Sequence, residues 1–185
     1  MNDIEILKEM LVSDAQVQLQ LQQDRPPSVK LIDKCTTVEI KGLPRDSIVI
    51  RAENFEDSLT IFKGTKSERK RADFVIVSDG ERGKWIICIE TQATDPKTAA
   101  HVIAQLKGAQ CFMSYCKCIG RSFWESEDFL EEYQYRFISM ADINIKKRRT
   151  RPFESRGELH SRPDVFLKIS ESPNLYFNKL LYEVF

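Results

Sequence analysis

Apolar residues fall in short runs along most of the chain, and two of these runs stand close together near its middle. Residues 74–77 and 85–89 are rich in β-branched and aromatic side chains, which favour strands. The segment between them, Ser-Asp-Gly-Glu-Arg-Gly-Lys, has the glycines and polar residues that are typical of a turn. The pattern therefore predicts a β-hairpin whose turn lies near Glu81 and Arg82.

The two predicted strands are apolar on both faces. Successive side chains of a strand point to opposite faces of its sheet. One face of this hairpin then carries Val75, Val77, Ile86 and Cys88, and the other carries Phe74, Ile76, Ile87 and Ile89. Strands of this kind are typical of the centre of a sheet that is covered on both sides. We therefore expect the hairpin to lie at the centre of the fold.

Two acidic residues stand at the open end of the predicted hairpin. Counting outward from the turn places Asp73 opposite Glu90, with Cβ atoms about 5 Å apart, and Gln92 on the face of Glu90. Carboxylates this close repel each other unless a hard divalent cation neutralises them. Asp73 and Glu90 are therefore candidate ligands for Mg²⁺ or Mn²⁺. The alternative is that both acids cap strand ends in solvent, or pair with Lys70 and Arg71.

Further helices and strands are predicted around the hairpin. Residues 2–21 have apolar positions at helical spacing and predict a helix that ends before Pro26 and Pro27. The other predicted elements are strands at Thr36–Ile40, Ser47–Arg51, Leu59–Phe62, 133–140 and 165–169, and a terminal helix or extended arm at 175–185. Together they predict an α/β (α+β) fold with a central mixed sheet flanked by helices.

A long amphipathic helix is predicted directly after the hairpin. Asp95 is suited to cap it, Pro96 suits its first turn, and the helix is expected to end near Gly120. Its apolar arc, which should pack on the sheet, comprises Ala99, Val102, Ile103, Leu106, Ala109 and Met113. Gln110 falls inside that arc, and Gln105 falls at its margin.

Length and composition indicate the class of protein. The chain has 185 residues, of which 42% are hydrophobic and 30% charged, and this predicts one globular domain rather than a disordered or membrane-embedded chain. We expect residues 1–57 to form the N-terminal helix and extra strands, 58–140 the core, and 141–185 a basic loop and C-terminal extension. The start lacks a signal-peptide pattern and no apolar run reaches about 18 residues. A cytoplasmic location without membrane contact is therefore expected.

The cysteines favour reduced thiols. There are five, an odd number, which suits free cysteines better than a disulfide framework. Cys116 and Cys118, taken with Cys111 and His101, match no usual zinc-binding spacing.

Charge is balanced overall but uneven along the chain. The 28 basic and 28 acidic residues give a formal net charge of zero, so the molecule as a whole does not attract nucleic acid. One basic block comprises Lys63, Lys66, Arg69, Lys70 and Arg71, and a second, in the predicted loop 144–163, comprises Lys146, Lys147, Arg148, Arg149 and Arg151. Such patches can hold a phosphate backbone. Each block is also compatible with a solvated loop, and only the first adjoins the acid pair.

The order of predicted elements and the placement of the acids resemble the PD-(D/E)xK, or restriction-endonuclease-like, nuclease superfamily over about residues 58–140. The common core of that family is a helix, three strands, a helix and a strand. An Asp opens its second strand, and an acidic-x-Lys triplet ends its third. Here Ala72-Asp73 stands at the first place and Glu90-Thr91-Gln92 at the second. Ala72 replaces the family's Pro and Gln92 replaces its Lys, although some active members carry Gln there.

The resemblance implies a metal-dependent nuclease that hydrolyses phosphodiester bonds, with DNA as the expected substrate, in a defence, mobile-element or repair system. It implies that Asp73, Glu90 and the backbone carbonyl of Thr91 hold Mg²⁺ or Mn²⁺. Gln92 would position the attacking water in place of the family's lysine. Because Gln carries no charge, positive charge would have to come from the metal or from a displaced base such as Lys97.

The two basic blocks take their roles from the same resemblance. The block from Lys63 to Arg71 would bind the nucleic-acid backbone beside the site, and Lys146 to Arg151 would close over it. Three classes of function stay open: a DNA nuclease, a catalytically inactive nuclease-fold module that binds nucleic acid or a partner protein, and an interaction protein with an unrelated α/β fold. A homodimer or a complex with a partner protein is compatible with each class.

Overall fold

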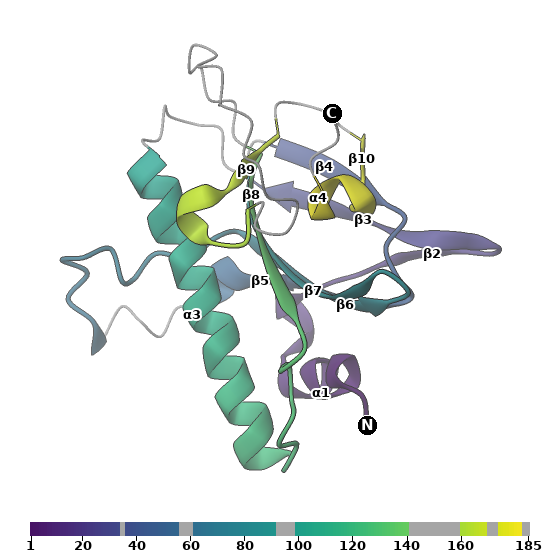
Figure 1. Cartoon of the computed structure of the whole chain (residues 1–185), viewed down its shortest axis with the longest axis horizontal. Helices are drawn as coiled ribbons and strands as arrows, with labels where there is room; N and C mark the ends of the chain where they lie inside the picture. Colours follow the sequence, from purple (N-terminus) through teal and green to yellow (C-terminus); the bar gives the residue numbers. More distant parts are fainter. Residues whose placement is uncertain (34–35, 56–60, 92–98, 141–159, 170–173, 183–185) are drawn as a thin grey trace.

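The strands form two mixed sheets, and the two longer helices cover one face of the larger sheet (Figure 1). The computed structural model describes residues 1–33, 36–55, 61–91, 99–140, 160–169 and 174–182. Its helices are α1 (Asp3–Met10), α3 (Ala99–Phe123) and α4 (Phe177–Leu181), and single 3-10 turns lie at Ser13–Ala15, Ala52–Asn54 and Pro163–Val165.

The larger sheet carries the hairpin at its centre. Its six strands follow the order β1 (Gln16–Val17), β5 (Asp46–Arg51), β6 (Phe74–Gly80), β7 (Gly83–Glu90), β8 (Gln134–Ser139) and β9 (Leu167–Lys168). Strands β1, β5, β6 and β7 are antiparallel neighbours, whereas β7, β8 and β9 run parallel. Helix α3 makes the crossover between β7 and β8 that a parallel pair requires.

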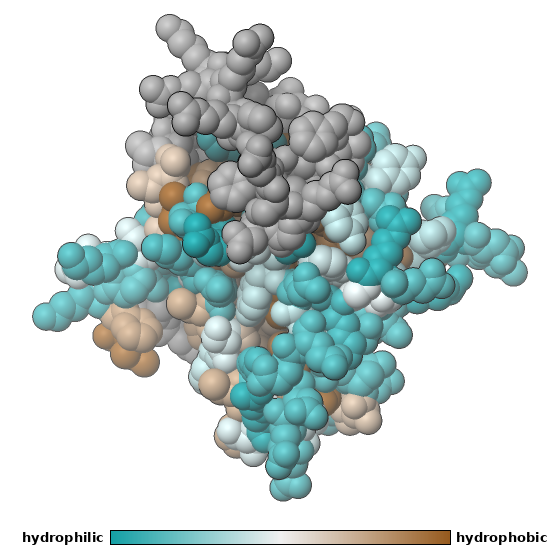
Figure 2. Space-filling view, in the orientation of Figure 1, coloured by the Kyte–Doolittle hydropathy of each residue, from teal (hydrophilic) through white to brown (hydrophobic). Residues whose placement is uncertain are grey.

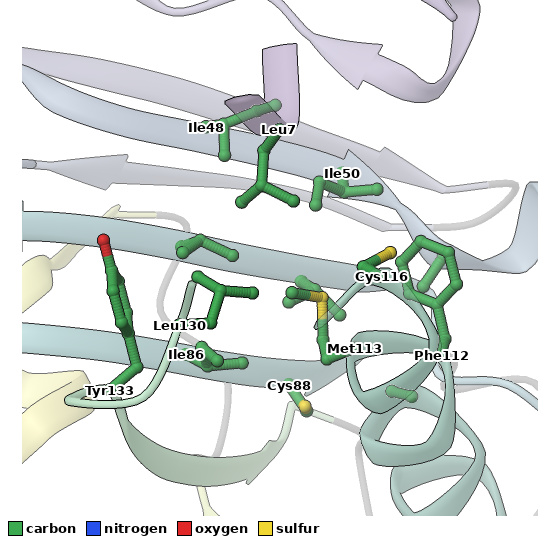
Figure 3. Close-up of a cluster of buried hydrophobic side chains, with 14 of the residues drawn as sticks. Leu7, Ile48, Ile50, Ile86, Cys88, Phe112, Met113, Cys116, Leu130 and Tyr133 are labelled. Atoms are coloured by element: carbon green, nitrogen blue, oxygen red, sulfur yellow. The ribbon is translucent and has the colours of Figure 1, made fainter. Parts of the chain in front are cut away.

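The second sheet packs on the opposite face of the larger one. Its order is β10 (Asn174–Tyr176), β4 (Thr36–Lys41), β3 (Arg25–Asp33) and β2 (Gln20–Gln22). On the helical face, Leu7, Ile86 and Met113 belong to one apolar cluster of α1, α3 and the sheet (Figure 3). On the other face, Ile40 and Leu180 belong to a second cluster with the sheet, the smaller sheet and α4. The predicted α/β class, with a mixed sheet covered on both sides, is therefore confirmed.

The predicted hairpin is confirmed in position and in register. β6 and β7 pair from Phe74 opposite Ile89 to Gly80 opposite Gly83. Glu81 and Arg82 therefore form the turn, as the sequence predicts. Gly83 has a φ of 102°, a backbone conformation that glycine adopts without steric cost.

Helix α1 is shorter than predicted. It begins with a capping box, in which Asn2 Oδ1 accepts a hydrogen bond from Glu5 N at 2.8 Å, and it ends at Met10. Residues 16–22, Gln-Val-Gln-Leu-Gln-Leu-Gln, alternate polar and apolar side chains with the period of a strand. Because β1 pairs Val17 with Val49, the prediction of a helix to about residue 21 is wrong beyond Met10.

The strand that neighbours β6 differs from the predicted one. Ile61 and Phe62, the described part of the predicted strand Leu59–Phe62, are exposed and lie in no strand. Strand β5 pairs with β6 instead, so this part of the sheet begins at Asp46 rather than near residue 58. Strand β3 was not predicted because Pro26 and Pro27 indicate a break. They lie at its beginning, where a strand tolerates residues that lack an N–H.

The other predicted elements agree more closely with the structure. Strands β4, β5 and β8 confirm the predictions at 36–40, 47–51 and 133–140, and β9 occupies part of 165–169. The terminal segment forms β10 and then α4. In the view of Figure 2 most of the described surface is hydrophilic. Val12, Leu21 and Phe123, three of the large exposed apolar side chains, come from separate parts of the chain.

Helix α3 packs on the sheet through a slightly rotated face. Gln105 is buried, although the sequence places it at the margin, whereas Ala99 is exposed and Gln110 is half-buried. The helix continues past Gly120 to Phe123, and the predicted start at Asp95 and Pro96 lies outside the described residues. Among the described residues, no helix is long and apolar enough to cross a membrane.

Two basic side chains hold the end of α4. Arg136 Nε donates to Leu181 O at 3.1 Å, and its guanidinium lies 4.4 Å from the centroid of the Trp85 ring. His160 Nε2 lies 2.9 Å from Leu180 O, and the His160 residue is 3% exposed. Carbonyls at the end of a helix lack intrahelical partners. Arg136 and His160 therefore stabilise the C-terminus of α4 against β8.

His160 is expected to make stability depend on pH. Burial lowers its pKa and the charge of Arg136 acts in the same direction, while the hydrogen bond to Leu180 opposes both. The unfolded chain then takes up a proton more readily than the folded one. The contribution of His160 to the stability of the folded protein is therefore complete above its ordinary pKa of about 6.5. It is lost as the pH falls below that value. The free energy of unfolding in urea can be measured for the wild type and for His160→Gln at about pH 7 and about pH 5. It should fall more between these pH values in the wild type than in the variant. Equal losses would contradict this prediction.

Candidate active site

Asp73 and Glu90 lie side by side at the open end of the hairpin, as the sequence predicts. Continuing the register of β6 and β7 by one pair places Asp73 opposite Glu90. Both are buried, with 2% and 0% of their surfaces exposed. Their neighbours two residues away, Val75 and Cys88, belong to the cluster of α1 and α3. The two acids therefore face the helical layer, and their burial argues against the alternative of solvated strand caps.

Thr91 fixes the carboxylate of Asp73. The amide of Thr91 donates to Asp73 Oδ2 at 2.6 Å, and its hydroxyl donates to the same oxygen at 2.8 Å. Two donors on one oxygen hold the carboxylate in a defined orientation, as supporting hydrogen bonds do around metal ligands. The resemblance implies a ligand role for the carbonyl of Thr91. The structure adds this orienting role, which the spacing of the motif does not reveal.

Ser139 is a further polar residue of the site, and the sequence reasoning missed it. It lies opposite Glu90 in the parallel pairing of β7 and β8, where Met140 N also donates to Glu90 O at 2.8 Å. Phe137, two residues earlier, belongs to the helical-face cluster, so Ser139 points to the face of Glu90. Ser139 is 1% exposed, and its hydroxyl has no hydrogen-bond partner among the described residues. Its place as a polar residue near the end of an apolar strand is the signal that could have found it.

The first basic block lies beside α3, with two of its members held by protein groups. Lys70 Nζ lies 3.3 Å from His101 Nε2 on α3. Arg71 Nη1 donates to Glu68 O at 2.9 Å and to Lys70 O at 2.6 Å, and its guanidinium lies 5.3 Å from the centroid of the Phe55 ring. These contacts anchor the chain that leads into Asp73. They also leave Lys70 and Arg71 less suited to contact a phosphate than the sequence suggests.

The remaining members of that block lie on a surface turn. Lys63 and Lys66 are exposed, and Arg69 is half-buried. The carboxylate of Glu68 accepts hydrogen bonds from Gly64 N and Lys66 N, both at 2.8 Å. Backbone hydrogen bonds of this kind lower the pKa of Glu68 and keep it ionised. The turn therefore presents Lys63 and Lys66 outward from an ordered backbone.

Several predicted site residues cannot be placed. Gln92, Lys97 and the second basic block, Lys146, Lys147, Arg148, Arg149 and Arg151, lie outside the described residues. Their predicted roles stay predictions. The described part of the site comprises Asp73, Glu90, Thr91 and Ser139.

The donors of the site fit a hard divalent cation. Within the described ranges, no group of three or more His, Cys, Asp or Glu residues is arranged so that it could hold a metal ion. Mg²⁺ does not need such a group, because it usually keeps several waters and binds proteins through one or two carboxylates. The paired carboxylates of Asp73 and Glu90 offer the oxygen ligands that Mg²⁺ and Mn²⁺ prefer.

The cysteines do not offer an alternative set of metal ligands. Cys88, Cys111, Cys116 and Cys118 are free thiols in the described chain. Burial raises the pKa of Cys88 and of Cys116, so both stay protonated, whereas a metal binds the thiolate. Cys111 and Cys118 are exposed on α3.

The fold and this site define an α+β protein with a buried acid pair at the end of its central hairpin. No family model, curated protein or solved structure matches the chain.

Proposed function

We propose that the protein is a metal-dependent nuclease that hydrolyses phosphodiester bonds, with DNA as its substrate. The observation that carries this proposal is the pair of buried carboxylates, Asp73 and Glu90, on neighbouring strands at one end of the central hairpin. Burying two acids together costs free energy unless a positive charge compensates them. A divalent cation supplies that charge, and phosphodiester hydrolysis is a reaction in which such cations act.

The order of the elements also supports the proposal. Helix α1, strands β5, β6 and β7, helix α3 and strand β8 follow one another along the chain, with further strands inserted between α1 and β5. A helix, three strands, a helix and a strand is the order that the resemblance to the PD-(D/E)xK superfamily implies. Asp73 precedes the second of these strands and Glu90 ends the third, which are the places expected for the acids.

Asp73 and Glu90 would hold Mg²⁺ or Mn²⁺ in the proposed site. When bound, such an ion lowers the pKa of water and neutralises charge on a phosphate. Thr91 keeps one oxygen of Asp73 occupied and so aims the other. Ser139 offers a hydroxyl beside Glu90. Gln92 is proposed to orient the attacking water, since its amide can both donate and accept hydrogen bonds.

Nucleic-acid contact is assigned to the basic segments in this proposal. Lys63 and Lys66 are exposed on the ordered turn that precedes the hairpin, where they can meet a phosphate backbone. Lys97 and the block from Lys146 to Arg151 are proposed to add further contacts. A catalytically inactive module that binds nucleic acid is the second candidate, and the neutral Gln92 in place of a lysine favours it.

Incubation of the purified 185-residue chain with linear and with circular DNA tests the proposal. We expect cleavage with Mg²⁺ or Mn²⁺ and none after chelation, because two carboxylates alone cannot stabilise the negative charge that develops in phosphoryl transfer. Isothermal titration with Mn²⁺ should release or absorb heat in the same protein. If the protein binds DNA but does not cleave it with either Mg²⁺ or Mn²⁺, the inactive module is favoured. The proposal would be overturned if the protein neither cleaved DNA nor bound metal.

A further inference from the structure

A row of side chains crosses neighbouring strands at the end of the larger sheet that carries the acids. Parallel pairing places Ser139 opposite Glu90 and Lys168 opposite Ser139. Because neighbouring strands lie about 4.8 Å apart, the Cα atom of Lys168 is about 10 Å from that of Glu90. Lys168 thus continues, on β9, the row that Asp73 and Glu90 begin.

Lys168 points to the same face of the sheet as the acids. Phe166, two residues earlier, packs against the cluster of α1 and α3, whereas Leu167 packs against the cluster on the opposite face. Alternation along the strand then directs Lys168 to the helical face. Its ammonium nitrogen lies 5.5 Å from the centroid of the Phe166 ring, which is consistent with this direction. The residue is exposed, so its ammonium is accessible to a ligand.

Among the described residues, the charges of the site leave room for one more cation. Two carboxylates balance one divalent metal ion, and each phosphodiester then adds a negative charge of its own. Gln92 brings no charge to the place where the PD-(D/E)xK superfamily, which the sequence resembles, has a lysine. Lys70 lies against His101, and Arg71 donates to backbone carbonyls. Lys168, by contrast, makes no ion pair within the described chain.

Ser139 adds to this row a buried polar group that has no partner in the described part of the chain. It stands between Glu90 and Lys168 and is 1% exposed, and its hydroxyl finds no partner among the residues that the structure describes. A buried hydroxyl without a partner is destabilising. A phosphate oxygen or a water ordered by it would satisfy this hydroxyl.

We propose that Lys168 is a phosphate-binding residue of the acid site, with Ser139 as the hydrogen-bond donor between it and Glu90. This inference rests on the proposed nuclease function, because the ligand is taken to be the phosphodiester of a nucleic acid. The flexible stem of lysine lets its ammonium move from the Phe166 ring to a phosphate. Lys168 then supplies, from an edge strand, the positive charge that Gln92 lacks.

Binding of a labelled DNA duplex by the 185-residue chain tests the role of Lys168. Ca²⁺ replaces Mg²⁺ to prevent cleavage, and affinity is measured by fluorescence anisotropy over a series of salt concentrations. Lys168→Ala should reduce the slope of log affinity against log salt by about 1, the loss expected for one phosphate contact. Lys168→Arg should keep the slope, because a guanidinium also binds phosphate. Lys30→Ala, at an exposed lysine of β3 in the second sheet, is the matched control and should leave it unchanged.

Two further measurements separate Lys168 from the metal ligands. Lys168→Ala should lower the rate of DNA cleavage on the order of 10²-fold, the effect of losing one group that stabilises developing charge. Its Mn²⁺ titration should match that of the wild type, because Lys168 holds no metal. Ser139→Ala should slow cleavage without changing the salt slope, because serine carries no charge, and Ser139→Thr should restore part of the rate.

The outcomes distinguish this inference from the function on which it rests. If the wild type cleaves DNA and Lys168→Ala matches it in salt slope and rate, the inference is overturned and the nuclease function stands. If the wild type binds DNA without cleaving it, the salt slope alone decides the role of Lys168. A wild type that does not bind DNA overturns both.

Discussion

Glu90→Gln and Asp73→Asn are each expected to reduce metal-dependent DNA cleavage by a factor on the order of 10²–10³ or more. Each substitution keeps the size of the side chain and removes one of the two negative charges that would hold the cation. Asn at position 73 can still accept hydrogen bonds from Thr91, so the end of the hairpin should keep its shape. Cleavage rates with Mg²⁺ and Mn²⁺, together with Mn²⁺ titration, measure the effect.

The stability of these variants provides an internal check. Two buried like charges repel each other, so removing one should not lower the unfolding temperature of the metal-free protein. Asp79→Asn is the matched control, because Asp79 lies in β6 at the end of the hairpin opposite to the two acids. Its carboxylate is 39% exposed and lies 3.7 Å from Lys84 Nζ. Asp79→Asn should cleave like the wild type. Equal losses of cleavage activity in all three variants would indicate a general defect of the hairpin rather than a metal site.

Gly108→Ala is expected to destabilise the protein by about 1–3 kcal/mol, although alanine favours an isolated helix over glycine by about 0.5–1 kcal/mol. A Cβ atom at Gly108 would overlap the carbonyl oxygen of Lys70 and approach Arg71 Nη1 at 3.1 Å. That carbonyl belongs to the backbone and already accepts from Arg71 at 2.6 Å, so it cannot rotate away as a side chain could. Helix α3 must then move from the segment that leads into Asp73.

Urea unfolding of Gly108→Ala measures this contact directly. Lys107→Ala, at an exposed neighbour on the same helix, should change stability by less than about 0.5 kcal/mol. We also expect Gly108→Ala to cleave DNA more slowly in folded preparations, because Asp73 follows the displaced segment by three residues. A Gly108→Ala protein as stable as the wild type would show that α3 and residue 70 do not lie in close contact.

Local patterns sufficed to predict the centre of the fold and the position of its acids. The runs before and after Glu81 and Arg82 are apolar on both faces, and this pattern leaves few alternatives to a buried hairpin. Once the turn is placed, the period of a strand sets Asp73 opposite Glu90 without any knowledge of the rest of the chain. Helix α3 follows from its 3.6-residue period in the same way.

Features that depend on distant parts of the chain could not be predicted. The end of α1 at Met10 is decided by the pairing of Val17 with Val49, since residues before position 21 satisfy a helical period as well. The neighbours of Glu90 on β8 and β9 depend on the register of parallel strands joined by long connections, and local sequence does not specify that register. Ser139 and Lys168 are brought beside Glu90 and along its row by this register alone.

The parallel arrangement of β7, β8 and β9 has a consequence for the growing chain. A polypeptide emerges from its amino end, and domains fold as their segments become available. Asp73 and Glu90 are made well before β8, which adjoins β7 in the sheet, and before β9, which adjoins β8. An unfinished chain can therefore pair β6 with β7 while the side of β7 beside the acids is still open. The complete end of the sheet arises only after Lys168 has been synthesised, so any activity that needs this end is confined to chains that have reached that point.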